Sequence, residues 1–182
     1  MRSVLLVAFT AAAGCGAVVW AAHAFGADTV AFAFLVVWVP MAALGTVSHF
    51  VTIRLPAAWH RLRSWEVGTR VYELLGVRVA KRLLRRGPLA VFNPHLHLPA
   101  APTASGLEAL ERRMCEAEAS HMVLFVLSVG VALNAAAHGW WAAAAWTMVF
   151  DMLMNGYPVM LQRYNRVLLR RRYPTGAPIT DG

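Results

Sequence analysis

Glu118 and His121 have the residue types and the spacing of a base catalyst. They are three residues apart, so on a helix they share one face. A histidine beside a carboxylate can act as a general base, because the carboxylate fixes the imidazole tautomer and stabilises the imidazolium. Acyl transfer to an alcohol needs such a base, since a sugar hydroxyl is a weak nucleophile at neutral pH. Taken alone, this spacing is more often that of an interfacial helix whose polar residues face lipid headgroups.

A second polar group lies on the last apolar run of the chain. Asn155 and Gln162 lie 4 and 11 residues after Asp151, and this spacing places all three on one helical stripe. Acids inside a membrane usually face the interior of a helix bundle and mark function. The alternative is a protonated acid that is hydrogen-bonded to a neighbouring helix. Gly156 and Pro158 should loosen this helix and free backbone carbonyls.

A mixed polar and basic cluster follows that stripe. It consists of Gln162, Arg163, Tyr164, Asn165 and Arg166, and the basic run Arg170–Arg172 comes after it. Arginines suit phosphates and pyrophosphates. If the last two apolar runs pack as an antiparallel hairpin, this cluster lies level with Glu118 and His121. We therefore expect a site for an anionic, long-chain substrate, with a purely cationic lipid anchor as the alternative.

A metal centre is a weaker interpretation of the same residues. Di-iron bundles use paired Glu-x-x-His motifs on two helices, and this chain has one such motif, at Glu118. His95 and His97 could supply ligands, but a loop that carries histidines is more often only polar. The two cysteines form no Cys-x-x-Cys pair and suggest no disulfide framework. We expect no metal ion and no cofactor other than a co-substrate.

The composition places these residues in a membrane protein. The chain has 182 residues, of which 59% are hydrophobic and 14% charged, whereas soluble domains have about 25% charged residues. The formal net charge is +8, which in a soluble protein would suggest nucleic acid as a partner. Here the basic residues flank apolar runs. We therefore expect them to meet phospholipid headgroups, and we expect no nucleic acid.

Four apolar runs predict an all-α integral membrane protein with four transmembrane helices in a single domain. The runs are 4–25, 29–53, 122–137 and 140–161. The first run is too long for a signal-peptide core of about 7–15 residues, so we expect an uncleaved helix. The connection Gly26-Ala27-Asp28 is tight, which predicts a first helix hairpin over 1–53. The last two runs predict a second hairpin over 122–161.

The distribution of charge predicts the orientation. All seventeen Lys and Arg residues lie in the N-terminal stub, in the segment 54–121 or in the tail 162–182. By the positive-inside rule these three regions are cytoplasmic, so both termini lie inside. We expect a multi-pass protein of the plasma membrane. Helices rich in Gly and Ala often pack against further copies, which leaves a homo-oligomer open.

The segment 54–121 is the only sizeable part that we expect outside the membrane. Its first half, 54–86, has the pattern of one or two amphipathic helices, with Trp65 on the apolar face, lying at the lipid surface. Residues 87–105 are rich in proline and small residues and predict an irregular loop. Ser105 is a suitable N-cap for a helix that starts near 106 and runs into the third span.

With these elements placed, three stretches resemble one family. SWEVGTRVYELLGVRVAK (64–81), EAEASH (116–121) and NGYPVMLQRYNR (155–166) resemble the glycosyl-4,4'-diaponeurosporenoate acyltransferase family, small membrane proteins associated with the last step of staphyloxanthin-type carotenoid synthesis. The resemblance spans roughly residues 60–168. It implies transfer of a fatty acyl group from acyl-CoA or acyl carrier protein. The implied acceptor is a sugar hydroxyl of a glycolipid or of a glycosylated isoprenoid or carotenoid.

The resemblance also marks family positions, to which we add the intramembrane acid Asp151. We expect His121 as the catalytic base and Glu118 as the group that orients it. The expected substrate-binding residues are Trp65, Glu66, Tyr72, Lys81, Asp151, Asn155, Gln162, Arg163, Tyr164, Asn165 and Arg166. The competing hypothesis is a non-catalytic scaffold or accessory subunit of a complex for envelope glycolipid synthesis or transport. Such a protein would need apolar helix faces and basic edges, but no mid-membrane acid.

Overall fold

The described part of the chain is all-helical, as the sequence predicts. The computed structural model describes residues 2–48, 50–86 and 103–174, and these contain helices and no strand. They form two compact units. The first unit combines 1–54 with 119–158, and the second combines 55–118 with 159–182. Most of the loop predicted at 87–105, and the end of the basic tail from 175 on, lie outside the described residues.

Three of the described helices are long and apolar enough to cross a membrane. They are α1 (Arg2–Phe25), α2 (Val30–Val47) and α7 (Ala104–Ala137). The prediction that a helix starting near 106 continues into the third span is confirmed. Its N-terminus differs slightly, since α7 begins two residues earlier, and Thr103 rather than Ser105 caps it through a 3.1 Å bond from Gly106 N to Thr103 Oγ1.

The fourth predicted span is interrupted by a π-helical segment. The chain forms α8 (Trp141–Asp151), the π-helix η2 (Met152–Gly156) and then α9 (Tyr157–Arg172). Tyr157 N donates to Met152 O, a bond that spans five residues, and Pro158 lacks the N–H that the next helical bond needs. The predicted loosening at Gly156 and Pro158 is therefore confirmed. Because α-helical spacing does not hold through a π segment, the offset that linked Gln162 to Asp151 no longer applies.

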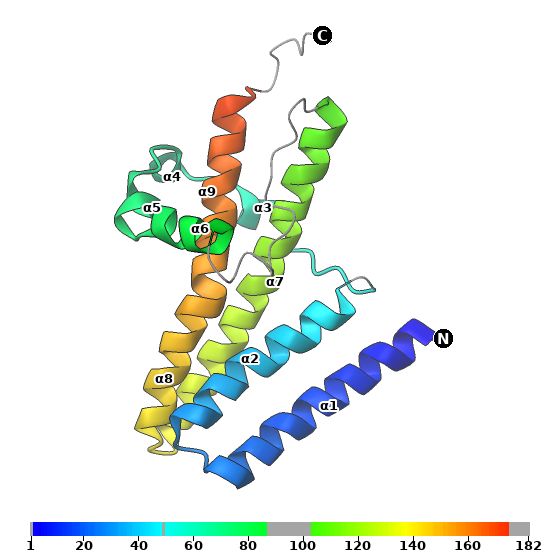
Figure 1. Cartoon of the computed structure of the whole chain (residues 1–182), viewed down its shortest axis with the longest axis vertical. Coiled ribbons are helices and arrows are strands. Elements are labelled where there is room, and N and C mark those ends of the chain that lie inside the picture. Colours follow the sequence, from blue (N-terminus) through cyan, green and yellow to red (C-terminus); the bar gives the residue numbers. More distant parts are fainter. Residues whose placement is uncertain (1, 49, 87–102, 175–182) are drawn as a thin grey trace. The chain divides into compact units, whose positions relative to one another are not determined.

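In the first unit, α1 and α2 form the predicted hairpin (Figure 1). Gly26 has a φ of 85°, which glycine adopts readily, and Thr29 Oγ1 accepts from Phe32 N to cap α2. The second helix ends at Val47, six residues before the predicted end at 53. Ser48 Oγ donates to Gly45 O at 2.7 Å, and the β-branched residues that follow are poor helix formers.

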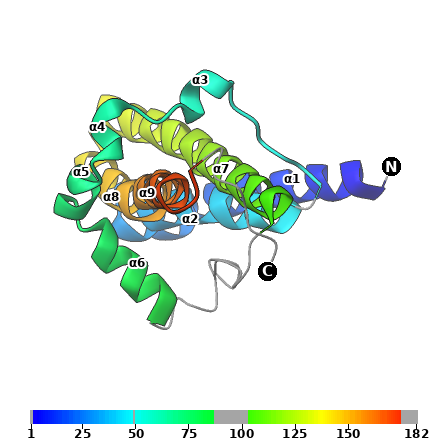
Figure 2. The same ribbon diagram turned by 90° about the horizontal axis from the view of Figure 1, so that it is seen from above.

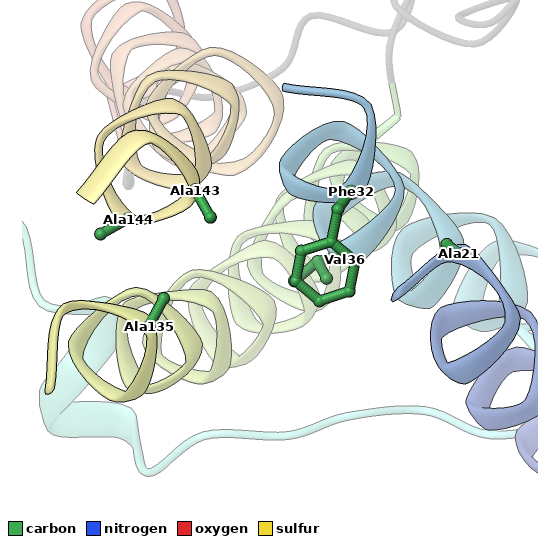
Figure 3. Packing of buried hydrophobic residues seen from close by; sticks show 6 residues of the cluster. All are labelled: Ala21, Phe32, Val36, Ala135, Ala143 and Ala144. Atoms are coloured by element: carbon green, nitrogen blue, oxygen red, sulfur yellow. The ribbon is translucent and has the colours of Figure 1, made fainter. Parts of the chain in front are cut away.

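The core of the first unit is built largely from small side chains. Phe32 and Val36 of α2 lie between Ala21 of α1 and the alanines of α7 and α8 (Figure 3). Those alanines are Ala135, Ala143 and Ala144. Small residues let helix backbones approach closely, which is the main source of packing attraction between helices in a membrane.

Asp28, in the turn between α1 and α2, caps α8. Its Oδ1 accepts the backbone N–H of Ala143 at 2.8 Å, and the residue at the N-cap position itself, Trp140, makes no side-chain cap bond. The first N–H groups of a helix have no partner within that helix. One acidic side chain therefore joins the first hairpin to the start of α8.

In the second unit, the described stretch 55–86 forms four short helices where the sequence predicts one or two. They are α3 (Ala57–His60), α4 (Ser64–Val67), α5 (Arg70–Leu74) and α6 (Val77–Arg86). The break between α3 and α4 has extended backbone at Arg61 and Arg63, and the next two breaks have left-handed backbone, at Thr69 with a φ of 57° and at Gly76 with a φ of 74°. These turns let the chain curve around α9, as the view from above shows (Figure 2).

The Asp28 cap generates a stability prediction. In Asp28→Ala the Ala143 N–H loses its acceptor, which should cost about 1 kcal/mol, typical of a lost N-cap. For a chain of this size we expect the melting temperature to fall by about 2–4 °C, measured by thermal unfolding in detergent micelles. Asp28→Asn keeps an acceptor oxygen and should melt close to wild type. An Asp28→Ala protein that melts like wild type would contradict the cap.

Candidate functional site

Arg163 on α9 is the centre of a buried ion-pair network in the second unit. Its Nε and Nη2 donate to the two carboxylate oxygens of Glu66 at 2.6 and 2.7 Å. Its Nη1 donates to Glu118 Oε1 at 2.7 Å and to the Trp59 carbonyl at 2.9 Å, and Nη2 also donates to the Arg61 carbonyl at 3.0 Å. A guanidinium has five N–H donors, so every donor of Arg163 is engaged within the protein.

Arg166 holds the other oxygen of Glu118. Its Nη1 donates to Glu118 Oε2 at 2.8 Å and its Nη2 to the His60 carbonyl at 2.6 Å, and both charged side chains are only 2% exposed. The Nδ1 atom of His60 lies 3.5 Å from Glu118 Oε1. Glu111, which lies about two turns before Glu118 on α7, forms an ion pair with Arg170. Its Oε1 is 2.6 Å from Arg170 Nη2. Glu118 is thus held by two arginines of α9.

Glu66 closes the network on the side of α4. Besides the two bonds from Arg163, it accepts from the Tyr72 hydroxyl and from Arg63 N. Burial opposes its ionisation, but the bonds from Arg163, Tyr72 and the Arg63 backbone outweigh burial and lower the pKa of Glu66 to about 2. Burial, together with the neighbouring Glu66 carboxylate, raises the pKa of Tyr72 well above its usual value. Glu66 is therefore an anion and Tyr72 a neutral donor.

We call Glu66, Tyr72, Glu118, Arg163 and Arg166 the Arg163 network. It contains two carboxylates and two guanidiniums, so its formal charges balance. Hydrogen bonds to Glu66 are the main reason that the pKa of Arg163 is raised above its usual value, so this residue stays charged. Losing one partner of a buried ion pair typically costs about 3–5 kcal/mol. These contacts tie α4, α5, α7 and α9 together.

Beside this network lie the remaining family positions of the second unit. Lys81 Nζ donates to Asn165 Oδ1 at 2.7 Å and sits 5.4 Å from the centre of the Tyr164 ring. Tyr164 meets the ring of Tyr72 edge-on at 6.0 Å in a small apolar cluster. Trp65 is 53% exposed. The structure therefore brings together most of the residues that the sequence predicts to bind substrate. Most of their polar groups bond to one another.

A separate polar chain in the first unit contains the predicted base. His121 Nδ1 lies 3.0 Å from Asn155 Oδ1, and Asn155 Nδ2 donates to Asp151 Oδ1 at 2.8 Å. Asn155 and Asp151 are both 0% exposed. The sequence predicts Glu118 as the group that orients His121. The acid is held by two arginines, and the imidazole contacts Asn155 instead.

The π-helical segment places Asn155 against α7. The next residue, Gly156, packs closely: an added Cβ would lie 3.4 Å from the Phe125 ring and 2.6 Å from Sδ of Met152, whose flexible side chain would have to shift. Phe125 is one turn beyond His121 on α7. The close approach at Gly156 therefore keeps the Asn155 amide within reach of the imidazole.

The pairing of His121 with Asn155 is the feature that sequence reasoning missed. The two residues are 34 positions apart, on α7 and on η2. Both were singled out, but helix spacing favoured the local partner Glu118. The antiparallel hairpin predicted for the last two runs was the signal that could have suggested a contact between them. Among the described residues, no group of three or more His, Cys, Asp or Glu side chains is placed to hold a metal ion.

Comparison with known proteins places these residues in a family. No similar protein was found among curated proteins or among solved structures. A family model named CrtO, described as glycosyl-4,4'-diaponeurosporenoate acyltransferase, matches residues 56–173. The match covers more than half of the chain and includes the Arg163 network, His121 and Asn155. The family resemblance seen in the sequence is thereby confirmed, and the chain belongs to the glycosyl-4,4'-diaponeurosporenoate acyltransferase family.

Proposed function

We propose that this protein is a membrane O-acyltransferase. It transfers a fatty acyl group from acyl-CoA or acyl carrier protein to a sugar hydroxyl of a glycolipid, or of a glycosylated isoprenoid or carotenoid. The family name supports the reaction class. The observation that carries the proposal is the His121 imidazole, which lies within the matched segment and is held at Nδ1 by Asn155.

The reaction needs one base that later acts as an acid. His121 Nε2 takes the proton of the sugar hydroxyl while the oxygen attacks the thioester carbonyl carbon. The new C–O bond forms and the C–S bond breaks, which gives an ester and a thiolate. The imidazolium then returns the proton to the thiolate, so that the free thiol leaves and the base is restored.

The Arg163 network has a structural role in this proposal. A guanidinium whose five donors are bonded within the protein has none to offer to a phosphate or to an oxyanion. The phosphates of the acyl donor would instead meet the exposed cations on the turns and short helices of the second unit. These are Arg61, Arg63, Arg70, Arg78 and Arg82.

The proposed location is the plasma membrane, with four spans and both termini in the cytoplasm. α8, η2 and the start of α9 serve as the fourth span, because a π segment keeps a helix continuous. Leu74 is 88% exposed and Val79 60% exposed, next to exposed arginines. Such a mixed surface suits the lipid interface, where apolar side chains enter and cations meet phosphate.

Removing the base should abolish acylation. We expect His121→Ala to lower the rate of acyl-ester formation by roughly 100-fold or more, the range for loss of a general base. The assay is lipid mass spectrometry of cells that make glycosyl-4,4'-diaponeurosporenoate and express the variant. His138→Ala is the matched control, because His138 is exposed, lies just after α7 and bonds the Asn134 carbonyl of that helix through Nδ1.

Two outcomes of that experiment would count against the proposal. Acylation at the wild-type level in His121→Ala, at equal membrane abundance, would remove His121 as the base. If expressing the wild-type chain changes the amount of the whole glycolipid but adds no acyl chain to it, the scaffold hypothesis gains. Unchanged lipids with wild-type protein in the membrane would also favour a non-catalytic role.

Glu118 should matter for stability rather than for chemistry. In Glu118→Gln the two arginines lose one of their carboxylate partners, and the second unit should become less stable by about 3–5 kcal/mol. Limited proteolysis and thermal unfolding in detergent measure this loss. Glu108→Gln, an exposed acid on the same helix, should leave stability unchanged. If folded Glu118→Gln protein is as inactive as His121→Ala, Glu118 regains a role in catalysis.

A further inference from the structure

We propose that Asn155 is the positioning residue of the His121 base and that Asp151 fixes the Asn155 amide. This inference rests on the proposed function. The three residues form a chain of two hydrogen bonds, of 3.0 Å from His121 Nδ1 to Asn155 Oδ1 and of 2.8 Å from Asn155 Nδ2 to Asp151 Oδ1. Asp151 and Asn155 are 0% exposed, so bulk water does not compete for these bonds.

The row of two hydrogen bonds has a direction, and this direction determines the tautomer of the His121 imidazole. The amide presents Nδ2 to Asp151, because a carboxyl oxygen there accepts the bond. Its other end, Oδ1, therefore faces His121, and this oxygen carries no hydrogen. The bond can form only if the proton of the neutral imidazole is on Nδ1. The lone pair is then on Nε2, the nitrogen that must accept the hydroxyl proton.

The same bond persists through the catalytic cycle. After protonation both ring nitrogens donate, and Nδ1 still has Asn155 Oδ1 as its acceptor. The ring need not flip or exchange partners between its basic and acidic forms. Orienting a base through a third group is the general logic of catalytic triads, here with a neutral amide as the group next to the imidazole.

The local backbone supports this role. Asn155 lies on η2, the only π-helical segment in the described part of the chain. Such segments are rare and occur frequently at functional sites. The alternative is that the three polar residues only join two helices by hydrogen bonds within the membrane. A purely structural bond would also fix the tautomer, but its loss would change stability without lowering the kcat of the folded protein.

Kinetics of the purified full-length chain in lipid nanodiscs test the inference. The probes are glycosyl-4,4'-diaponeurosporenoate as acceptor and palmitoyl-CoA as donor. We expect Asn155→Ala to lower kcat by roughly 10- to 100-fold, as loss of an orienting partner does, with KM near wild type. Asp151→Asn keeps an oxygen acceptor and should retain most of the activity, whereas Asp151→Ala should behave like Asn155→Ala. Asn134→Ala, at an exposed position of α7, is the control.

A second measurement does not depend on activity. ¹⁵N NMR of histidine-labelled protein distinguishes the two imidazole tautomers, and comparison with His121→Ala assigns the signal. We expect the proton on Nδ1 in the wild type and loss of this preference in Asn155→Ala. A wild-type signal with the proton on Nε2, or wild-type kcat in folded Asn155→Ala, would overturn the inference. Absence of any acyl transfer by the wild type would instead overturn the proposed function, while the tautomer still tests the positioning.

Discussion

The second unit depends on the ion pairs of the Arg163 guanidinium, whose side chain is 13% exposed. A charge taken out of water is stable only when it is paired and its donors are satisfied. Arg163 meets both conditions with the carboxylates of Glu66 and Glu118 and with two backbone carbonyls, that of Trp59 in α3 and that of Arg61 just after α3. The short helices α3 to α6 bury few apolar side chains. Their path around α9 is therefore fixed by hydrogen-bond geometry more than by an extensive apolar core.

In the first unit the buried polar groups are an amide and an acid, Asn155 and Asp151, rather than arginines, and burial demands hydrogen-bond partners for them too. Alanine-rich packing brings α2, α7 and α8 together, and Asp151 and Asn155 are buried among such helices. Each polar side chain must then find a partner inside the unit. Asn155 donates its amide nitrogen to Asp151 Oδ1 and contacts His121 with its oxygen. In the first unit the hydrogen bonds of the buried polar groups orient the His121 imidazole. In the second unit the arginines and carboxylates are bonded to one another.

Much of the fold could be predicted from the sequence, because it follows from local patterns. The tight Gly26–Asp28 turn, the long helix ending at Ala137 and the break near Pro158 are all set by neighbouring residues. The division of 54–86 into four helices could not be predicted, since it depends on a left-handed turn at Thr69, a residue type that rarely adopts one. The hydrogen-bond partners of His121 and Glu118 could not be predicted either. Helix spacing offered Glu118 to His121, but two arginines more than 40 residues away hold this acid.

Family resemblance marks residues without separating those that hold the fold from those that do chemistry. Here the hydrogen bonds of Arg163 help to make that distinction, because all five of its donors are bonded within the protein. For Arg163 to bind a substrate anion, it would have to release a buried carboxylate, at a cost of about 3–5 kcal/mol. That cost is comparable to the gain from a good charged contact at a binding site. His121 faces no such conflict, because its contact with Asn155 involves only Nδ1. The motif around Arg163 therefore builds the unit, and the histidine with its amide partner is the better candidate for the reaction.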